Sequence, residues 1–163
     1  MKKEEIINYL DNLNIWYEIT LHEAVYNMEE LSKIDLPYKD RDAKNLFVRD
    51  DKKRNYYLIT VCGDKRVDLK EFKDKTNTRR LTFCSETDLL NILGLIPGSV
   101  SPFGLLNDKE LRVSFYLDKD LIKTEEDIIG IHPNDNTATV WLKSVDLINI
   151  IKSHGNLVYI VEI

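Results

Sequence analysis

The chain has 163 residues, of which 43% are apolar and 31% are charged, and its formal net charge is −5. This length and balance are typical of one globular unit with a sizeable core, and we expect a single domain over residues 1–163. No apolar run approaches the ~18 residues that span a bilayer, and the acidic balance argues against broad nonspecific nucleic-acid binding. We therefore expect neither a membrane nor a DNA partner.

The N-terminal residues lead directly into an amphipathic helical pattern and lack the apolar core of a signal peptide, so we expect a cytoplasmic protein. The two cysteines, Cys62 and Cys84, are too few for a disulfide framework and lack the spacing of metal ligands. Each lies in an apolar, strand-like run. This predicts two buried, reduced thiols, with a catalytic thiol as the less favoured alternative.

The first half of the chain mixes helical and strand patterns. The expected order is helix, strand, helix, two strands, helix and strand, over residues 3–13, 15–20, 28–34, 43–49, 55–61, 68–75 and 81–84. Asn27 is placed to cap the second helix, with Glu30 at the third position. The two consecutive strands flank a five-residue polar turn, Asp50 to Arg54, which predicts a β-hairpin.

The second half continues the mixture. The expected order is helix, three strands, helix and strand, over residues 86–93, 111–117, 127–131, 137–142, 144–154 and 157–161. Ser85 caps the first of these helices and Gly94 ends it, while Gly155 closes the second. Mixed helices and hairpins predict an α+β domain around one mixed, largely antiparallel sheet.

The most unusual stretch lies within the second half, between the helix over 86–93 and the strand over 111–117. Pro97, Gly98, Pro102 and Gly104 fall within eight residues. Proline fixes φ and lacks an N–H donor, and glycine permits positive φ, so neither a regular helix nor a central strand is expected here. The apolar neighbours argue against a solvated linker. Two interpretations stay open: a rigid, carbonyl-rich pocket wall, or a buried connection between a helix and a strand.

Two other places carry polar side chains at strand ends. Lys44-Asn45 begins the predicted hairpin, and His132-Pro133 follows the strand over 127–131. Strand ends and loops are where binding sites are usually built. Taken singly, each place also has an ordinary explanation, because Lys44 could be a solvated lysine and His132 could complete a turn.

Taken together and in order, these three places resemble a known family. Lys44-Asn45-Leu46-Phe47 is similar to the family's Lys-Asn-Leu-Phe-Leu strand. The stretch from Gly98 to Gly104 is similar to its Gly-x-x-x-Pro loop with the following Phe-Gly. His132-Pro133-Asn134, followed by Thr137 to Val140, resembles its late His-Pro segment.

The family that these motifs resemble is the YbaK/prolyl-tRNA-editing superfamily, and within it the free-standing prolyl-tRNA deacylases of the PrdX/ProXp-ala kind. The resemblance spans nearly the whole chain. One departure is the segment Asp40-Arg41-Asp42-Ala43, which is more charged than the glycine-rich approach expected before the lysine.

The resemblance implies a trans-editing enzyme that hydrolyses the ester of alanine wrongly attached to proline tRNA. It implies the acceptor end of mischarged tRNA(Pro) as the substrate, prolyl-tRNA synthetase as an additional partner, and neither a metal nor another cofactor. It also implies that the mixed sheet forms a pseudo-barrel flanked by helices.

The resemblance further implies roles for individual residues. Lys44 would lie near the phosphate of the terminal adenosine, and Asn45 and His132 near the scissile ester. Backbone carbonyls between Gly98 and Pro102 would hold the α-amino group of the substrate. Candidates for the apolar wall are Phe47, Val100, Phe103 and Leu31, with plain core as the alternative, above all for Leu31. The full set of expected substrate-binding residues is Gly98, Ser99, Val100, Ser101, Pro102, Phe103, Gly104 and Phe47.

These residue types suit ester hydrolysis. No Ser-His-Asp or Cys-His set and no zinc-ligand cluster has a plausible spacing, so we expect catalysis by orientation of a water molecule and the ester, assisted by the 2′-hydroxyl of the tRNA. A synthetase pocket built for proline rejects a smaller amino acid by only ~1–3 kcal/mol, so a second, smaller pocket is needed to remove alanine.

Two alternatives stay open beside an alanine-specific deacylase. The first is a deacylase for Cys-tRNA(Pro) or another small mischarged amino acid. The second is a catalytically silent module that binds a tRNA end or a synthetase. The combination of Lys44, the loop from Gly98 to Pro102, and His132 favours catalysis.

Overall fold

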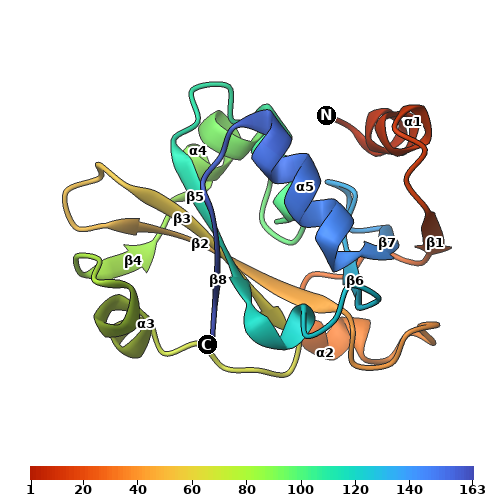
Figure 1. Cartoon of the computed structure of the whole chain (residues 1–163), viewed down its shortest axis with the longest axis horizontal. Coiled ribbons are helices and arrows are strands. Elements are labelled where there is room, and N and C mark those ends of the chain that lie inside the picture. The colour runs from red at the N-terminus through yellow and green to blue at the C-terminus, as the bar shows by residue number, and fades with distance from the viewer.

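A computed structural model describes all residues from 1 to 163 (Figure 1). The α-helices are α1 (Lys3–Asn12), α2 (Met28–Leu31), α3 (Leu69–Thr76), α4 (Glu86–Asp88) and α5 (Ser144–His154). The strands are β1 (Tyr17–Leu21), β2 (Ala43–Asp50), β3 (Tyr56–Cys62), β4 (Leu81–Phe83), β5 (Val113–Asp118), β6 (Ile128–Ile131), β7 (Ala138–Lys143) and β8 (Val158–Val161). A π-helix, η1 (Leu89–Leu93), and two 3-10 helices, η2 (Pro102–Asn107) and η3 (Lys119–Leu121), complete the chain.

The expected elements are present in the expected order, and local capping explains their starts and ends. The side chain of Asn27 accepts a hydrogen bond from the N–H of Glu30 (2.8 Å), and that of Ser85 accepts one from the N–H of Asp88 (3.1 Å). Gly94 and Gly155 both adopt positive φ and end the helices before them. The helix that Asn27 caps is shorter than expected, because it ends at Leu31.

The stretch rich in proline and glycine departs from the expectation in one respect. It contains a short 3-10 helix, η2, which begins at Pro102. Proline is tolerated at the first position of a helix, where no N–H donor is needed, and the side chain of Ser101 accepts a hydrogen bond from the N–H of Phe103 (3.2 Å). The proline therefore starts a tight turn of helix here.

The strands form two sheets. A three-stranded antiparallel sheet has the order β1-β7-β6, and a five-stranded sheet has the order β4-β2-β3-β5-β8. In the larger sheet β2 pairs antiparallel with β3 and β4, whereas the pairs β3-β5 and β5-β8 are parallel. The expected α+β class with a mixed sheet is thus confirmed, but the strands form two sheets and not the expected single one, and they do not close into a barrel.

The two sheets meet at the charged segment before β2. Asp42 forms an isolated parallel bridge with Gly130 of β6, and the N–H of Gly130 donates to the carbonyl of Arg41 (2.9 Å). The guanidinium of Arg41 donates to the carbonyls of Ile128 (2.7 Å) and Leu121 (3.0 Å). Arg41 therefore has a structural task, which is to hold the loop before β6 against the larger sheet.

The hydrophobic core lies on both faces of the five-stranded sheet. A cluster of 23 buried residues fills the space between this sheet, the smaller sheet and helices α1, η1 and α5. A second cluster of 7 residues lies on the other face, where Phe72 of α3 packs beside Val48 of β2. In Figure 1, α5 crosses one face of the larger sheet, and α3 lies beside β4, at the end of the molecule away from α1. No helix combines the length and apolarity needed to cross a bilayer.

Candidate functional site

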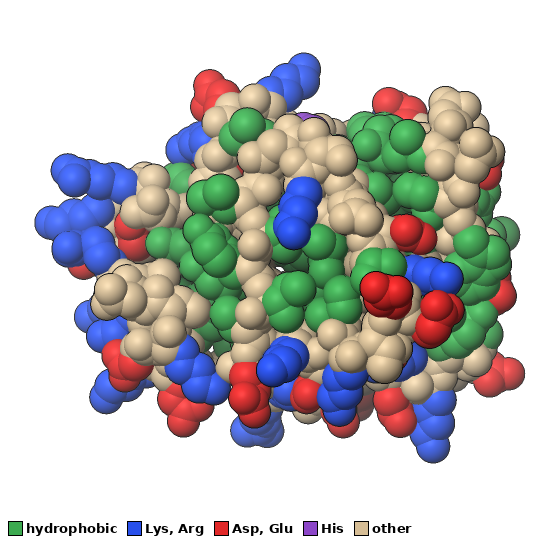
Figure 2. All heavy atoms as spheres, in the orientation of Figure 1, with side chains coloured by type: hydrophobic (Ala, Val, Ile, Leu, Met, Phe, Trp, Pro, Cys, Tyr) green, Lys and Arg blue, Asp and Glu red, His purple; other side chains and the backbone are tan.

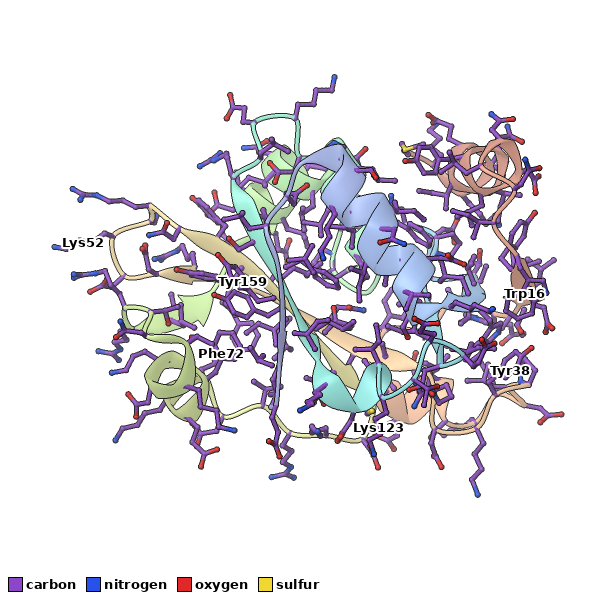
Figure 3. The ribbon with its side chains drawn as sticks, in the orientation of Figure 1. Trp16, Tyr38, Lys52, Phe72, Lys123 and Tyr159 are labelled. Carbon is purple, nitrogen blue, oxygen red and sulfur yellow. The ribbon has the colours of Figure 1, made fainter.

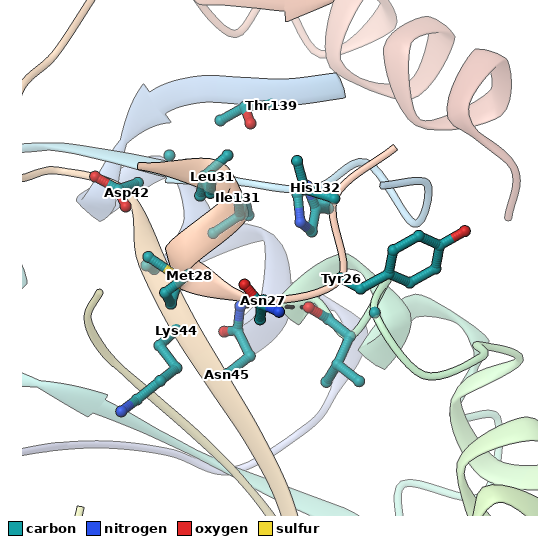
Figure 4. A pocket seen from close by; sticks show the side chains of 15 residues that line it. Tyr26, Asn27, Met28, Leu31, Asp42, Lys44, Asn45, Ile131, His132 and Thr139 are labelled. Atoms are coloured by element: carbon teal, nitrogen blue, oxygen red, sulfur yellow. Dashed lines mark hydrogen bonds between the residues drawn. The ribbon is translucent and has the colours of Figure 1, made fainter. Parts of the chain in front are cut away.

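A cavity of about 260 Å³ lies where the start of β2 meets α2, the β6-β7 hairpin and the loop before η2 (Figure 4). Its wall combines apolar side chains with a few polar ones. The lining residues are Val25, Tyr26, Asn27, Met28, Leu31, Asp42, Ala43, Lys44, Asn45, Gly98, Val100, Gly130, Ile131, His132 and Thr139. All three places that the sequence singled out therefore meet at one cavity.

Asn45 is held in a fixed orientation. It is the third residue of β2 and pairs with Thr60 of β3, whose hydroxyl donates to Asn45 Oδ1 (2.5 Å). Asn45 Nδ2 in turn donates to the carbonyl of Val100 (3.4 Å). An amide nitrogen carries two N–H groups, so one donor remains for a ligand in the cavity.

The ring of His132 is oriented by a hydrogen bond within the β6-β7 hairpin. Its Nδ1 lies 2.8 Å from the carbonyl of Ala138, which can only accept, so Nδ1 carries the proton when the ring is neutral. Burial lowers the pKa of His132, and the nearby ring of His22 adds to this effect, while the hydrogen bond to Ala138 opposes it. At neutral pH the ring is uncharged, and Nε2, which has no hydrogen-bond partner within the protein, is an acceptor.

The loop and the histidine are physically joined. The hydroxyl of Ser101, which is fully buried, donates to the main-chain carbonyl of His132. On the other side His22 Nε2 lies 3.0 Å from the hydroxyl of Thr139, and the rings of His22 and His132 have centroids 6.1 Å apart. These contacts fix the backbone of the β6-β7 hairpin relative to the loop, and Ser101 thus acts as a positioning residue.

Lys44 occupies a different side of β2 from Asn45. Successive side chains of a strand point to opposite faces, and Lys44 shares its face with Leu46 and Val48 on the α3 side of the sheet. Figure 4 shows its amine pointing away from His132 and Thr139. The amine forms no salt bridge or hydrogen bond in the structure, so its charge is free for a ligand at the edge of the cavity.

Gly98 lies at the rim, where the chain approaches another segment closely. Its φ is +90°, a conformation that side chains with a Cβ rarely adopt. A Cβ added there would lie 3.0 Å from Tyr26 Cδ1 and 3.6 Å from Asn136 Nδ2. The glycine is therefore required both by the backbone conformation and by the contact with the segment before α2.

The remaining loop residues lie outside the lining. Phe103 is fully buried in the large core cluster, and a Cβ on Gly104 would meet Leu95 Cδ1 at 2.6 Å. Ser99 and Pro102 are also buried, and the hydroxyl of Ser99 donates to the carbonyl of Ile96 (2.9 Å). Both interpretations of the stretch apply to different parts of it, because Gly98 and Val100 face the cavity while residues 102–104 are core.

The expected apolar wall divides in the same way. Phe47 lies in the large core cluster with its ring stacked on that of Tyr56, at a centroid distance of 6.0 Å, and does not line the cavity. Leu31 and Val100 do line it. Phe47 follows Asn45 on the same face of β2, so it packs directly beneath the polar end of the strand.

The sequence did not single out three contributors to the cavity. Tyr26 and Met28 come from the segment around α2, and Asp42 comes from the bridge between the sheets. The unusually charged segment before Lys44 was the only sequence signal that Asp42 contributes to the cavity. No local signal pointed to Tyr26 or Met28, because their place depends on how α2 folds over the start of β2.

Asp42 is the one carboxylate in the lining. It has no salt bridge, and burial raises its pKa, with the charges of Asp40 and Asp64 acting in the same direction. A hydrogen bond to its own backbone N–H acts in the opposite direction. The cavity thus presents an unpaired carboxylate and an unpaired ammonium group, Asp42 and Lys44, beside the neutral pair of Asn45 and His132.

The two cysteines are free and only partly buried, and neither lines the cavity. Burial raises the pKa of both thiols, that of Cys84 to about 12, so both are protonated at neutral pH. Their burial is less complete than expected. No group of three or more His, Cys, Asp or Glu side chains has a geometry that could hold a metal ion.

Comparison with known proteins places this site in a family. Residues 22–150 match the model of the aminoacyl-tRNA editing domain, a range that includes every residue lining the cavity. The chain belongs to the aminoacyl-tRNA editing domain family. The resemblance to prolyl-tRNA-editing proteins that the motifs around Lys44, Gly98 and His132 indicated is thus confirmed at the level of the family.

The chain is similar to individual members along almost its whole length. It is 42% identical over 161 residues to the prolyl-tRNA editing protein ProX of Acetoanaerobium sticklandii, covering 99% of this chain and 97% of that protein. It is 30% identical over 156 residues to the prolyl-tRNA synthetase associated domain-containing protein 1 of Mus musculus, covering 94% and 92%.

Solved structures share the fold. The crystal structure of a proposed trans-editing enzyme for prolyl tRNA synthetase superposes with a TM-score of 0.70 at 16% identity, covering 100% of this chain and 98% of that one. The crystal structure of the hypothetical protein APE2540 gives a TM-score of 0.68 at 15% identity, covering 96% and 97%.

Proposed function

We propose that this protein hydrolyses the ester bond of a mischarged aminoacyl-tRNA, and that its substrate is Ala-tRNA(Pro). The observation that carries the proposal is the convergence of Asn45 and His132 on one small cavity, each with hydrogen-bonding capacity that the protein itself leaves unused. The 42% identity to a prolyl-tRNA editing protein supports proline tRNA as the carrier.

In the proposed reaction the oxygen of a water molecule attacks the carbonyl carbon of the aminoacyl ester. The bond from that carbon to the ribose oxygen breaks, which gives the free amino acid and the tRNA with its hydroxyl restored. The free N–H of Asn45 donates to an ester oxygen, and the neutral Nε2 of His132 accepts a hydrogen bond from the water or from the neighbouring ribose hydroxyl. An aminoacyl ester needs little activation, so orientation supplies much of the rate.

The cavity supports selection by size. Apolar side chains from three segments, Leu31, Val100 and Ile131, leave a space of about 260 Å³ that must also hold the ester and part of the ribose. The methyl group of alanine fits such a space more readily than the pyrrolidine ring of proline. Cysteine is close to alanine in size, so hydrolysis of Cys-tRNA(Pro) is the alternative specificity.

Charged groups at the cavity suit the ends of the substrate. We assign Lys44, whose amine lies on the outer side of β2, to the phosphate of the terminal adenosine, for which a lysine is a compact point charge. The carbonyls of the loop from Gly98 to Pro102 accept hydrogen bonds from the α-ammonium group. The carbonyl of Val100 is already the acceptor for Asn45 (3.4 Å), so binding of the ammonium group and orientation of the amide are coupled there.

The experiment that tests the function follows loss of the ester from alanyl-, cysteinyl- and prolyl-tRNA(Pro) with purified protein. We expect rapid hydrolysis of the alanyl ester and protection of the prolyl ester. Faster hydrolysis of the cysteinyl ester than of the alanyl ester would show that cysteine is the preferred amino acid. Binding of all three without hydrolysis would show a silent module and overturn the proposal.

A variant of the same experiment tests Lys44. Lys44→Ala is expected to lose most of the activity at subsaturating tRNA while keeping the thermal stability of the wild type, because the amine makes no contact within the protein. The matched control is Lys119→Ala, which removes an exposed lysine of η3 that does not line the cavity. An unchanged rate for Lys44→Ala would exclude the assigned role.

A further inference from the structure

The charges of this acidic protein are distributed very unevenly. Residues 49–80 contain eleven Lys and Arg against six Asp and Glu, whereas the remaining residues contain twelve against twenty-two. None of the eleven cations of residues 49–80 enters the mechanism proposed above. Figure 2 shows Lys and Arg side chains gathered at the end of the molecule where the β2-β3 turn and α3 lie.

Six of these cations form what we call the basic face: Lys52, Lys53 and Arg54 in the β2-β3 turn, Lys70 and Lys73 on α3, and Arg80 before β4. All but Lys73 are exposed, and none of those five forms a salt bridge. Figure 3 shows Lys52 extending from the turn into solvent. Such side chains are free to contact a ligand of opposite charge.

Local contacts make the basic face continuous. Arg79 holds Asp51 through two hydrogen bonds (2.7 and 3.1 Å), which joins the β2-β3 turn to the segment before β4. That ion pair neutralises the acid nearest to Lys52. Between α3 and β4 lies a hollow of about 400 Å³ lined by Leu69, Lys70, Lys73, Arg80 and Leu81, with no acidic side chain in its wall.

The basic face lies on the same side of the larger sheet as Lys44. Lys44, Leu46 and Val48 alternate along one face of β2, and on this face Val48 packs with Phe72 of α3. From Lys44 to the end of β2 at Asp50 the strand advances by six residues, or about 20 Å. Lys44, at the rim of the cavity, and the basic face therefore lie on the same side of the larger sheet.

We propose that the basic face binds the phosphate backbone of the base-paired acceptor stem while the unpaired 3′ end enters the cavity. The proposal rests on the proposed function, since it is Lys44 that marks where the terminal phosphate sits. The aminoacyl end of a tRNA is a short single strand followed by a duplex, so phosphates that lie well back from Lys44 belong to base pairs. Backbone contacts of this kind position an RNA helix without reading its sequence.

The location also explains how an acidic protein binds a polyanion. Acidic side chains dominate one rim of the cavity, where Asp35, Asp40 and Asp64 line a second hollow beside Asp42, with Lys39 as its one cation. An RNA stem would be repelled from that rim and attracted to the basic face. The uneven charge thus selects one of the possible directions of approach.

The test compares Lys70→Ala/Lys73→Ala/Arg80→Ala with a control that removes three exposed lysines elsewhere, Lys109→Ala/Lys119→Ala/Lys152→Ala. Each is assayed on the alanine ester of the full tRNA, of a minihelix with only the acceptor stem, and of the trinucleotide CCA. We expect the first variant to lose roughly tenfold or more in kcat/KM on the tRNA and the minihelix at low salt, with a shallower salt dependence, and to match the wild type on the trinucleotide.

Equal activity of the two variants on the minihelix would overturn the proposal and leave the basic face to another partner, such as an acidic protein. An equal loss on the trinucleotide would also overturn it, because the damage would then lie in the cavity. If the wild type hydrolyses none of the three esters, the proposed function fails. The affinity for the uncharged minihelix, measured by fluorescence anisotropy, would still test the basic face alone, and equal affinities for the two variants would overturn it.

Discussion

Two groups of polar side chains differ in how much of their hydrogen-bonding capacity is used within the protein. Asp108, only 2% exposed, accepts hydrogen bonds from the N–H groups of Arg112 (3.0 Å) and Val113 (2.9 Å) and from Asn156 Nδ2 (2.9 Å). Asn156 also donates to the carbonyl of Val113 (2.8 Å) and lies 2.7 Å, through Oδ1, from His154 Nδ1. This network joins the start of β5 to the end of α5 and leaves little capacity unused.

The cavity shows the opposite condition. Asn45 retains a free donor, His132 Nε2 has no partner, and Lys44 and Asp42 carry charges without a counter-ion. Buried polar groups are normally hydrogen-bonded, so unused capacity that gathers in one cavity indicates ligand binding, whereas a closed network indicates structure. The comparison predicts that changes in the two regions will affect different measurements.

The largest effect is expected from Gly98→Val. The substitution places a branched side chain at φ +90° and 3.0 Å from Tyr26 Cδ1, so the loop must move at the cavity. A displacement of ~1 Å at such a site can cost on the order of 100-fold in rate, and we expect alanine removal to be abolished in single-turnover assays with only a modest loss of thermal stability.

The matched control for this prediction is Gly155→Val. Gly155 also has a positive φ, +119°, and a Cβ there would lie 2.8 Å from Leu111 Cδ1, but it closes α5 away from the cavity. We expect it to lower the melting temperature while the rate per folded molecule stays that of the wild type. Should Gly98→Val behave in the same way, the loop is scaffold and has no role in the site.

Asp108→Ala tests the closed network. It leaves the N–H groups of Arg112 and Val113 and one N–H of the Asn156 amide without an acceptor in a buried place, which is expected to cost about 3 kcal/mol of the free energy of unfolding. Denaturant titration measures this loss. The activity per folded molecule should not change, and a selective loss of activity would contradict the division between the two regions.

The pH dependence of the hydrolysis rate tests the role of His132. Its pKa is lowered below the ordinary value of 6.5, chiefly by burial, so the neutral, active ring persists as the pH falls to 6.5 and is lost only at lower pH. The single-turnover rate should therefore decline only below that value. Because the folded-state pKa is the lower one, the contribution of His132 to stability is also present above pH 6.5 and lost on acidification through the folded pKa.

His22 supplies a control for this profile. Its ring, 6.1 Å from that of His132, lowers the pKa of His132, so His22→Gln is expected to move the acid limb of the rate to higher pH. His132→Gln should remove the limb. A limb that persists in His132→Gln would assign it to another group.

The smallest effect is expected from Pro102→Ala. Pro102 is buried at the start of η2 and does not line the cavity, so the change only releases the fixed φ of one residue behind Ser101. We expect a loss of activity of only severalfold, much smaller than that of Gly98→Val, with a small decrease in melting temperature. An effect as large as that of Gly98→Val would show that the path of the loop depends on the proline as well.

The sequence by itself determined the identity and order of the elements, because the signals that define them are local. Helical and strand periodicities, the caps at Asn27 and Ser85, and glycines at Gly94 and Gly155 act within a few residues. The motifs around Lys44, Gly98 and His132 also determined the family. They carried enough information to predict that the three places act together.

The tertiary structure alone decided which residues reach the cavity. The parallel pairing of β3 with β5, the pairing of β1 with β7, and the placement of Tyr26 over Gly98 join segments far apart in the chain, and no local pattern specifies such pairs. The same applies to Phe47 and Phe103, whose apolar character suits a pocket wall and a core equally well. Only the backbone path, set by the packing of both sheets, directs them into the core and leaves Asn45 and His132 at the cavity.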